Sequence, residues 1–153
     1  MMQSPLIRSA VRGDAPEIAS LSDALGYPTT IPAVAERLDR LGASTRDHVL
    51  VAVGPLGRIV GWLHGAEIEM LESGRTVEIL GLVVSREARR FGVGRSLVQA
   101  FEKWAAERGH REATVRSNVL RAESHPFYER LGYRRVKSQH VYRRALDADQ
   151  ASP

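Results

Sequence analysis

A basic turn that carries two glycines is the segment of this sequence with the clearest chemical potential. It runs Arg89-Arg90-Phe91-Gly92-Val93-Gly94-Arg95-Ser96. If a helix begins inside this segment, its first N–H groups have no partner within the helix and the helix dipole adds positive potential there. Such a helix start binds phosphates, and a glycine lets the ligand come close to the backbone. The segment therefore predicts an anion site, with Arg89, Arg90 and Arg95 adding charge around it.

The stretches on either side of this turn are the elements that would hold it in place. Residues 77–84 read Val-Glu-Ile-Leu-Gly-Leu-Val-Val, an apolar and β-branched run of strand length. After the turn, Leu97, Phe101 and Trp104 recur at helical spacing, which predicts an amphipathic helix from Gly92 to about Arg108. A buried strand, a glycine turn and a helix are the expected order.

The spacing of the turn resembles that of one enzyme superfamily. The pattern Arg89-x-x-Gly92-x-Gly94 after an apolar strand is similar to the Gln/Arg-x-x-Gly-x-Gly/Ala loop of the GCN5-related N-acetyltransferases (GNAT superfamily). A P-loop would need Gly-Lys-Ser/Thr, and a dinucleotide fold would need a third glycine; this sequence has neither at the turn. The resemblance implies acetyl-CoA as cosubstrate. Its pyrophosphate would be bound by Arg89, Arg90, Phe91, Gly92, Val93, Gly94, Arg95 and Ser96, and its acetyl and pantetheine arm by the backbone of Leu82, Val83 and Val84.

The order of predicted elements extends the resemblance over nearly the whole chain. Apolar periodicity and turn residues predict an order of β-α-α-β-β-β-α-β-α-β-β, which is the GNAT order. We expect an α+β fold in three layers: a central, mixed, mostly antiparallel sheet of six to seven strands with about four helices on both faces. In the family, the strand before the loop is bulged, and Gly81 is where a bulge would help; the first two helices cover the acceptor.

Residues 1–146 would form a single acetyltransferase domain and 147–153 a disordered tail. The predicted strands are 6–8, 48–53, 58–67, 77–84, 112–116, 133–136 and 139–145. The predicted helices start near Asp14, Ala33 and Gly92, and a fourth lies within the stretch from Arg121 to Gly132.

Two further residues acquire roles from the resemblance. The run Phe127-Tyr128-Glu129-Arg130-Leu131-Gly132-Tyr133 is similar to the family signature whose tyrosine protonates the leaving CoA sulfur. A phenol, with a pKa of about 10, suits a thiolate leaving group. Pro126 is a departure from that signature, because a proline there either starts or kinks the helix. Asn118 would contact pantetheine, or would simply cap a helix.

Glu78 is the candidate catalytic base. It lies in the strand 77–84, eleven residues before Arg89, which is the spacing of the base glutamate in histone-type members of the superfamily. A carboxylate there could instead bind the amine without removing its proton. Glu67, Glu69, His64 or a water molecule are the alternatives for the base.

Composition limits the other classes of function. The sequence has no cysteine, so a disulfide, a thiol nucleophile and a thiolate metal site are excluded, and its five histidines show no metal-binding spacing. No apolar run is long enough for a membrane span, and the N-terminus does not resemble a signal peptide, so we expect a cytoplasmic protein. The net charge is +4, but the arginines are dispersed, which favours a polyanionic cosubstrate over nucleic acid.

The sequence therefore predicts an N-acetyltransferase that moves an acetyl group from acetyl-CoA to a primary amine, by direct attack in a ternary complex. The acceptor, a small-molecule or peptide amine, is not specified by any motif. The alternative is a CoA-binding sensor or interaction module of the same fold without turnover. No metal, membrane or nucleic-acid partner is expected. The last strands, around Val141 and Tyr142, could pair with a second copy in a homodimer.

Overall fold

The computed structural model describes residues 4–116 and 124–147, and the chain divides into two compact units, residues 1–116 and 117–153. The second unit contains α4 (Ser124–Arg130). The proposed domain end at residue 146 stays a prediction. The first unit contains, in order, β1 (Leu6–Ser9), η1 (Arg12–Asp14), α1 (Ala15–Ala24), α2 (Ile31–Ala43), β2 (Asp47–Val53), η2 (Pro55–Gly57), β3 (Ile59–Met70), β4 (Gly74–Val84), η3 (Arg86–Phe91), α3 (Val93–Glu107) and β5 (Thr114–Val115).

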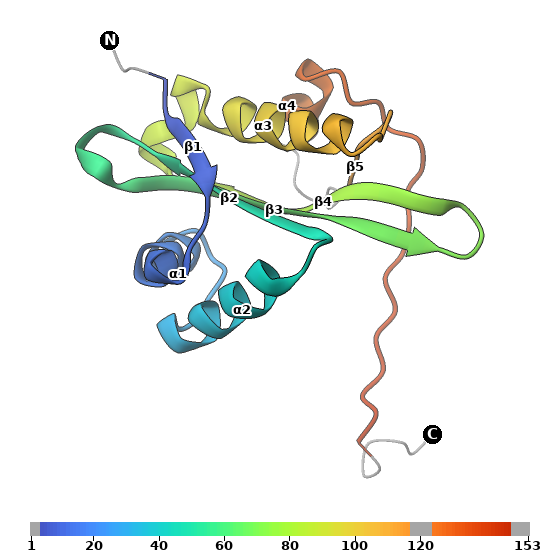
Figure 1. Cartoon of the computed structure of the whole chain (residues 1–153), viewed down its shortest axis with the longest axis horizontal. Coiled ribbons are helices and arrows are strands. Elements are labelled where there is room, and N and C mark those ends of the chain that lie inside the picture. The colour runs from blue at the N-terminus through green and yellow to red at the C-terminus, as the bar shows by residue number, and fades with distance from the viewer. Residues whose placement is uncertain (1–3, 117–123, 148–153) are drawn as a thin grey trace. The chain divides into compact units, whose positions relative to one another are not determined.

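The strands form one mixed, mostly antiparallel sheet. Its order is β1-β2-β3-β4-β5; the first three pairs are antiparallel and β4 pairs with β5 in parallel. Figure 1 shows α1 and α2 on one face of the sheet and α3 on the other. The α+β class, the helices on both faces and the parallel crossover through α3 are confirmed.

The two faces of the sheet can be assigned from β3, because side chains alternate along a strand. Trp62 donates its Nε1–H to Ser22 Oγ of α1 at 3.1 Å, so the even-numbered side chains of β3 face α1 and α2. A Cβ built on Gly65 would lie 2.1 Å from the ring of Phe101 in α3, so the odd-numbered positions face α3. The largest fully buried side chains are Phe101, Leu63, Leu97, Val51, Val77, Val93 and Val98.

The start of α1 lies where the sequence predicts it, next to Asp14. Asp14 precedes the helix, and its side chain makes no capping bond to the first turn. Its carboxylate instead accepts two hydrogen bonds from Arg8, at 2.8 and 2.9 Å, and one from the Val11 N–H at 2.8 Å. The pKa of Asp14 is lowered by the hydrogen bond from Arg8, although burial opposes this. Asp14 therefore ties β1 to the start of α1.

The predicted strands at 133–136 and 139–145 are wrong. Residues 131–147 form neither strand nor helix, and Val136, Val141 and Tyr142 are 82%, 85% and 89% exposed. The strand predicted at 112–116 is reduced to two residues. β-branched and aromatic residues favour a strand only when a neighbouring strand pairs with them and buries one face. The sheet within the described residues therefore has five strands, not six or seven.

Candidate active site

The strand that leads to the glycine turn carries a bulge near its middle. His64 of β3 pairs with Gly81 and Gly65 pairs with Ile79, so Leu80 has no partner on β3. The parallel strand β5 pairs only with Glu78 and Ile79, directly before the bulge. Within residues 4–116 and 124–147, β4 from Leu80 onward therefore has no strand on this side. Its backbone N–H and C=O groups along that edge can bond to a ligand.

The turn after β4 is held against the sheet by a few backbone contacts. The Ser85 N–H donates to Val60 O at 2.8 Å, and Ala88 is buried under the turn. Gly92 has φ +75° and is the N-cap of α3, whose first helical hydrogen bond runs from Ser96 N to Gly92 O at 2.9 Å. Only glycine adopts this left-handed conformation without strain. A Cβ on Gly92 would meet no atom within 4 Å, so the helix start faces open space.

The side chains of the turn separate into two groups. Arg89, Arg90 and Arg95 are exposed, together with Phe91, which is 49% exposed. Val93 and Gly94 are buried beneath the helix start and Ser96 is half-buried. The geometry is therefore that of an anion site, in which the backbone N–H groups at the start of α3 are surrounded by exposed arginines. Val93 and Gly94 would act through their backbone alone.

Glu78 lies on the α1–α2 face of β4, beside the bulge, because its register partner on β3 is the even-numbered Ala66. Its side chain is 8% exposed. Both carboxylate oxygens accept from the Arg116 guanidinium, Oε1 from Nη2 at 3.1 Å and Oε2 from Nε at 3.3 Å. The two side chains therefore form a charge-assisted, two-point contact. A contact between Arg116 and Glu78 was not predicted from the sequence, although Arg116 directly follows the strand that pairs with β4.

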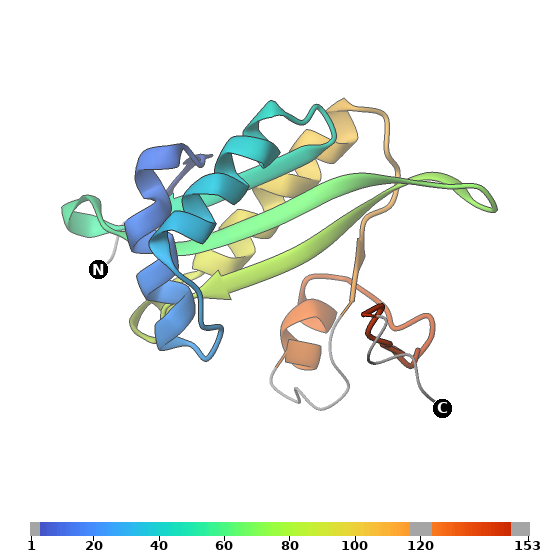
Figure 2. The same ribbon diagram turned by 90° about the horizontal axis from the view of Figure 1, so that it is seen from below.

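The two other glutamates proposed as bases are placed elsewhere. Glu67 lies on the opposite face, where Arg108 Nε donates to Oε1 at 2.9 Å and a ring nitrogen of His110 lies 2.6 Å from Oε2. The hydrogen bond from Arg108 is the main reason that the pKa of Glu67 is lowered to about 2. Glu69 is exposed in the β3–β4 hairpin, 3.8 Å from Arg75. Figure 2 shows this hairpin extending past the helices of its own unit. Neither carboxylate lies with Glu78 at the bulge.

His64 is on the same face as Glu78 and is held by a second carboxylate. Its Nε2 lies 2.7 Å from Asp47 Oδ1, and Ser44 Oγ donates to Asp47 Oδ2 at 2.7 Å. The imidazole and the carboxylate are 23% and 20% exposed. Asp47 was not selected from the sequence, because only the pairing of β2 with β3 brings it to His64.

Tyr128 lies in α4 of the second unit. The helix begins at Ser124, so Pro126 falls in its first turn, where the missing N–H of proline costs nothing. The Tyr128 ring is half-buried and contacts Phe127 and Tyr133 edge-on, with centroids 5.0 and 6.0 Å apart. Asn118 lies outside the described residues.

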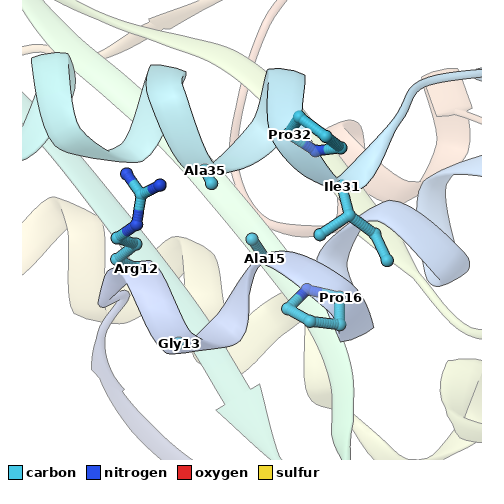
Figure 3. Close-up of a pocket in the computed structure, with 7 residues that line it drawn as sticks. All are labelled: Arg12, Gly13, Ala15, Pro16, Ile31, Pro32 and Ala35. Atoms are coloured by element: carbon cyan, nitrogen blue, oxygen red, sulfur yellow. The ribbon is translucent and has the colours of Figure 1, made fainter.

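A separate hollow of ≈ 520 Å³ lies between the start of α1 and α2. Figure 3 shows Arg12 at one end of it and Pro16, Ile31 and Pro32 at the other. An ion pair between Arg12 and Asp39 of α2 closes its polar end. None of the lining residues comes from β4, η3 or α3, so this hollow is not part of the anion site.

The described residues contain neither a candidate membrane span nor a candidate metal site. No helix among the described residues is long and apolar enough to span a membrane. Within the same residues, no group of three or more His, Asp or Glu side chains is arranged to hold a metal ion.

In this fold a bulged strand with an open edge leads into a glycine turn at the start of a helix. The sequence matches the model of the acetyltransferase (GNAT) family over residues 18–133, and the chain belongs to this family. It is an acyltransferase. A comparison with curated proteins gave no match.

Solved structures show the same fold. A GNAT family acetyltransferase from Staphylococcus aureus is 21% identical with a TM-score of 0.75, over 92% of this chain and 99% of the other. The aminoglycoside 6'-N-acetyltransferase AAC(6')-Ih from Acinetobacter baumannii is 18% identical with a TM-score of 0.81, over 93% and 99%. Another, AAC(6')-Iy in complex with CoA, is 18% identical with a TM-score of 0.81, over 94% and 96%. At these identities the likeness is one of fold.

Proposed function

We propose that this enzyme transfers an acetyl group from acetyl-CoA to a primary amine, by direct attack of the amine on the thioester in a ternary complex. The observation that carries the proposal is the continuous path from the open edge of β4, past its bulge at Leu80, to the glycine turn at Gly92. The open edge suits an extended amide-containing arm, and the turn suits a pyrophosphate.

The proposed cosubstrate contacts follow this path. The backbone of Leu82, Val83 and Val84 would bind pantetheine amides along the open edge of β4. Residues 89–96 would bind the pyrophosphate, through N–H groups at the start of α3 and through the exposed arginines. Asn118 stays a predicted pantetheine contact. An N–H group freed by the bulge would donate to the oxyanion of the tetrahedral intermediate.

The chemistry requires the acceptor to lose two protons. An ammonium first gives up one proton to become a nucleophile; its nitrogen then bonds to the thioester carbon, the C–S bond breaks, and a second proton is lost as the amide forms. We assign protonation of the departing CoA sulfur to Tyr128. Glu78 supplies a carboxylate that would attract the ammonium, and it is the base that the sequence resemblance predicts.

A cationic amine is the acceptor class that the charges support. Glu69 and Glu72 lie on or beside the β3–β4 hairpin and Glu78 lies in β4, so these two strands carry carboxylates that would favour a cationic acceptor. Two of the carboxylates are also ion-paired, Glu69 with Arg75 and Glu78 with Arg116, and Glu67 lies on the opposite face of the sheet. Since two structural neighbours are described as aminoglycoside acetyltransferases, aminoglycosides belong in an acceptor panel beside polyamines and peptide amines.

Calorimetric titration with acetyl-CoA and with CoA tests the cosubstrate. Gly92→Glu would place a carboxylate at the start of α3 and abolish micromolar binding, because the anion would repel the pyrophosphate. Gly109→Glu is the matched control: Gly109 lies just beyond the other end of α3, has φ +91°, and would also place its side chain in open space. Both variants replace a glycine that has a positive φ, so each adds backbone strain of the same kind. Equal loss of binding in both, or no binding in wild type, would contradict the proposed site.

Release of the CoA thiol over the amine panel tests turnover. Tyr128→Phe should bind acetyl-CoA normally and lower kcat by about 100-fold, which is the typical worth of a general acid. Tight binding of acetyl-CoA with no thiol release for any amine would instead favour a CoA-binding module without turnover. The cytoplasmic location and the homodimer stay predictions; sedimentation velocity would test the second.

A further inference from the structure

The imidazole of His64 lies at the level of the β4 bulge. His64 and Gly81 are register partners across β3 and β4, so the histidine stands directly opposite the residue that follows the unpaired Leu80. Opposite residues in an antiparallel pair have Cβ positions about 5 Å apart. The His64 side chain points to the face that α1 and α2 cover. Glu78, whose partner Ala66 is two residues from His64 along β3, points to the same face.

The contacts of Asp47 orient the ring of His64. A carboxylate 2.7 Å from Nε2 favours the tautomer in which Nε2 carries the hydrogen and donates it. Nδ1 then keeps its lone pair and is a proton acceptor. Ser44 Oγ donates to the other oxygen of Asp47 at 2.7 Å and accepts from the Arg46 N–H at 3.1 Å, so the carboxylate is itself fixed from the end of α2.

Glu78 is less suited than His64 to accept a proton. Both of its oxygens are occupied by Arg116, and a proton added to the carboxylate would oppose that ion pair. Its side chain is 8% exposed, whereas that of His64 is 23% exposed. Imidazole is also the side chain whose charge changes most readily near neutral pH. The two groups therefore suit different tasks: Glu78 attracts a cation, and His64 can take a proton from it.

We propose that His64, oriented by Asp47, is the base that deprotonates the acceptor ammonium in this acetyltransferase, and that Glu78 binds the ammonium electrostatically. The inference rests on the proposed function. Nδ1 takes one proton from the ammonium, directly or through one water, and gives neutral amine and imidazolium. The amine nitrogen bonds to the thioester carbon, the C–S bond breaks, and the second proton reaches the sulfur. The imidazolium returns its proton to solvent. Asp47 acts through His64 and is a positioning residue.

Amines that differ in basicity test this role. A strongly basic alkylamine is protonated at neutral pH and needs a base, whereas a fluorinated analogue of the same shape is largely neutral and does not. His64→Gln should lower kcat for the basic amine by about 100-fold and for the fluorinated amine by only a few-fold. Asp47→Asn should show the same selectivity with a smaller loss. His48→Gln is the matched control, because His48 lies on the neighbouring strand but faces α3 and stacks on Trp104.

Each outcome decides the role of His64. Equal losses for both amines, with acetyl-CoA affinity unchanged, would overturn the proposal, because a merely structural histidine does not distinguish amine basicity. A selective loss in Glu78→Gln with none in His64→Gln would also overturn it and return the base to Glu78. Our expectation is that Glu78→Gln raises KM for the cationic amine more than it lowers kcat. Failure of the proposed function is distinguishable, since wild type would then bind no acetyl-CoA, and that result would overturn this inference as well.

Discussion

At the residue scale, the packing of α3 on the sheet depends on two glycines of β3. A Cβ on Gly65 would lie 2.1 to 2.8 Å from three carbons of the Phe101 ring, and one on Gly61 would lie 3.1 Å from Val93 Cγ1 and 3.2 Å from Leu97 Cδ1, both in α3. The Phe101 ring is fully buried, so it has no vacant position to move into. These contacts let the helix approach β3 closely and hold the start of α3, with its anion site, at the end of β4.

Gly65→Ala should destabilise the fold by about 1–3 kcal/mol, the usual effect of overpacking a core. The measurement is the free energy of unfolding in urea. Gly42→Ala in α2 is the control, because a Cβ there meets no atom within 4 Å and alanine favours a helix by about 1 kcal/mol over glycine. Combining Gly65→Ala with Phe101→Leu should recover part of the loss. Equal stability of the Gly65 variant and wild type would contradict this packing argument.

The sequence could predict which residues sit near the chemistry, but not what each of them contacts. The glycine turn, Glu78 and a bulge near Gly81 follow from spacing along one strand and one helix. Arg116 on Glu78, and Asp47 on His64, depend on which strands are neighbours and in what register, and no local pattern carries that information. The same reason separates Glu67 from Glu78: Glu67 pairs with Val77 and Glu78 pairs with Ala66, so they occupy adjacent positions of the ladder and point to opposite faces.

At the element scale, the C-terminal end of α3 is fixed by a polar and aromatic cluster that consists of His48, Glu67, Trp104, Arg108 and His110. Arg108 and His110 bond to Glu67, Arg108 lies 4.7 Å from the centroid of the Trp104 ring, and the His48 ring stacks on Trp104 with centroids 4.8 Å apart. Arg108 Nη2 also donates to Thr45 O at 2.9 Å. The cluster therefore joins the end of α3 to β2, to β3 and to Thr45 in the loop before β2.

This cluster should make the fold sensitive to acid in two ranges of pH. The pKa of His48 is lowered, first by burial and then by the charge of Arg108. The contribution of the neutral His48 ring to stability is therefore complete above pH 6.5, the ordinary pKa of histidine, and is lost as the pH falls below that value. The pKa of Glu67 is lowered to about 2, mainly by Arg108, so its contribution is complete above its ordinary value of 4.5 and is lost toward pH 2.

Thermal unfolding at a series of pH values checks this prediction. The melting temperature of wild type should fall first below about pH 6.5 and again below about pH 4.5. His48→Gln should remove the first fall, and Glu67→Gln should reduce the second while lowering stability at neutral pH by about 2 kcal/mol. A wild-type melting temperature that stays constant from neutral pH to about pH 5 would contradict the role assigned to His48.

Elements held by several partners were the ones that the sequence predicted well. The four strands β1 to β4 and the helices α1 to α3 each combine apolar periodicity with a buried face, and their predicted positions agree with the structure to within a few residues. The segment 131–147 has strand-forming residues without a buried face, since Val136, Val141 and Tyr142 are exposed. Local propensity was the only signal there, and it was not sufficient.

At the scale of the whole molecule, the proposed reaction requires the two units to act together. The cosubstrate path lies in residues 1–116, whereas Tyr128, the proposed acid, belongs to the second unit. A tyrosine that protonates the CoA sulfur must come within hydrogen-bonding distance of it when acetyl-CoA is bound. Under the role proposed for Tyr128, cosubstrate binding is expected to stabilise residues of the second unit as well as the first, because a ligand stabilises the groups that bind it.

Hydrogen exchange with and without saturating acetyl-CoA tests that link. The amides from Phe127 to Tyr133 should exchange more slowly in the complex, together with those of the first turn of α3. Tyr128→Phe keeps the ring and should retain the protection while kcat falls, whereas Gly92→Glu should lose the protection in both places because it does not bind the cosubstrate. Slower exchange confined to residues before 117, with Tyr128→Phe fully active, would remove Tyr128 from the mechanism and leave the sulfur to be protonated by water.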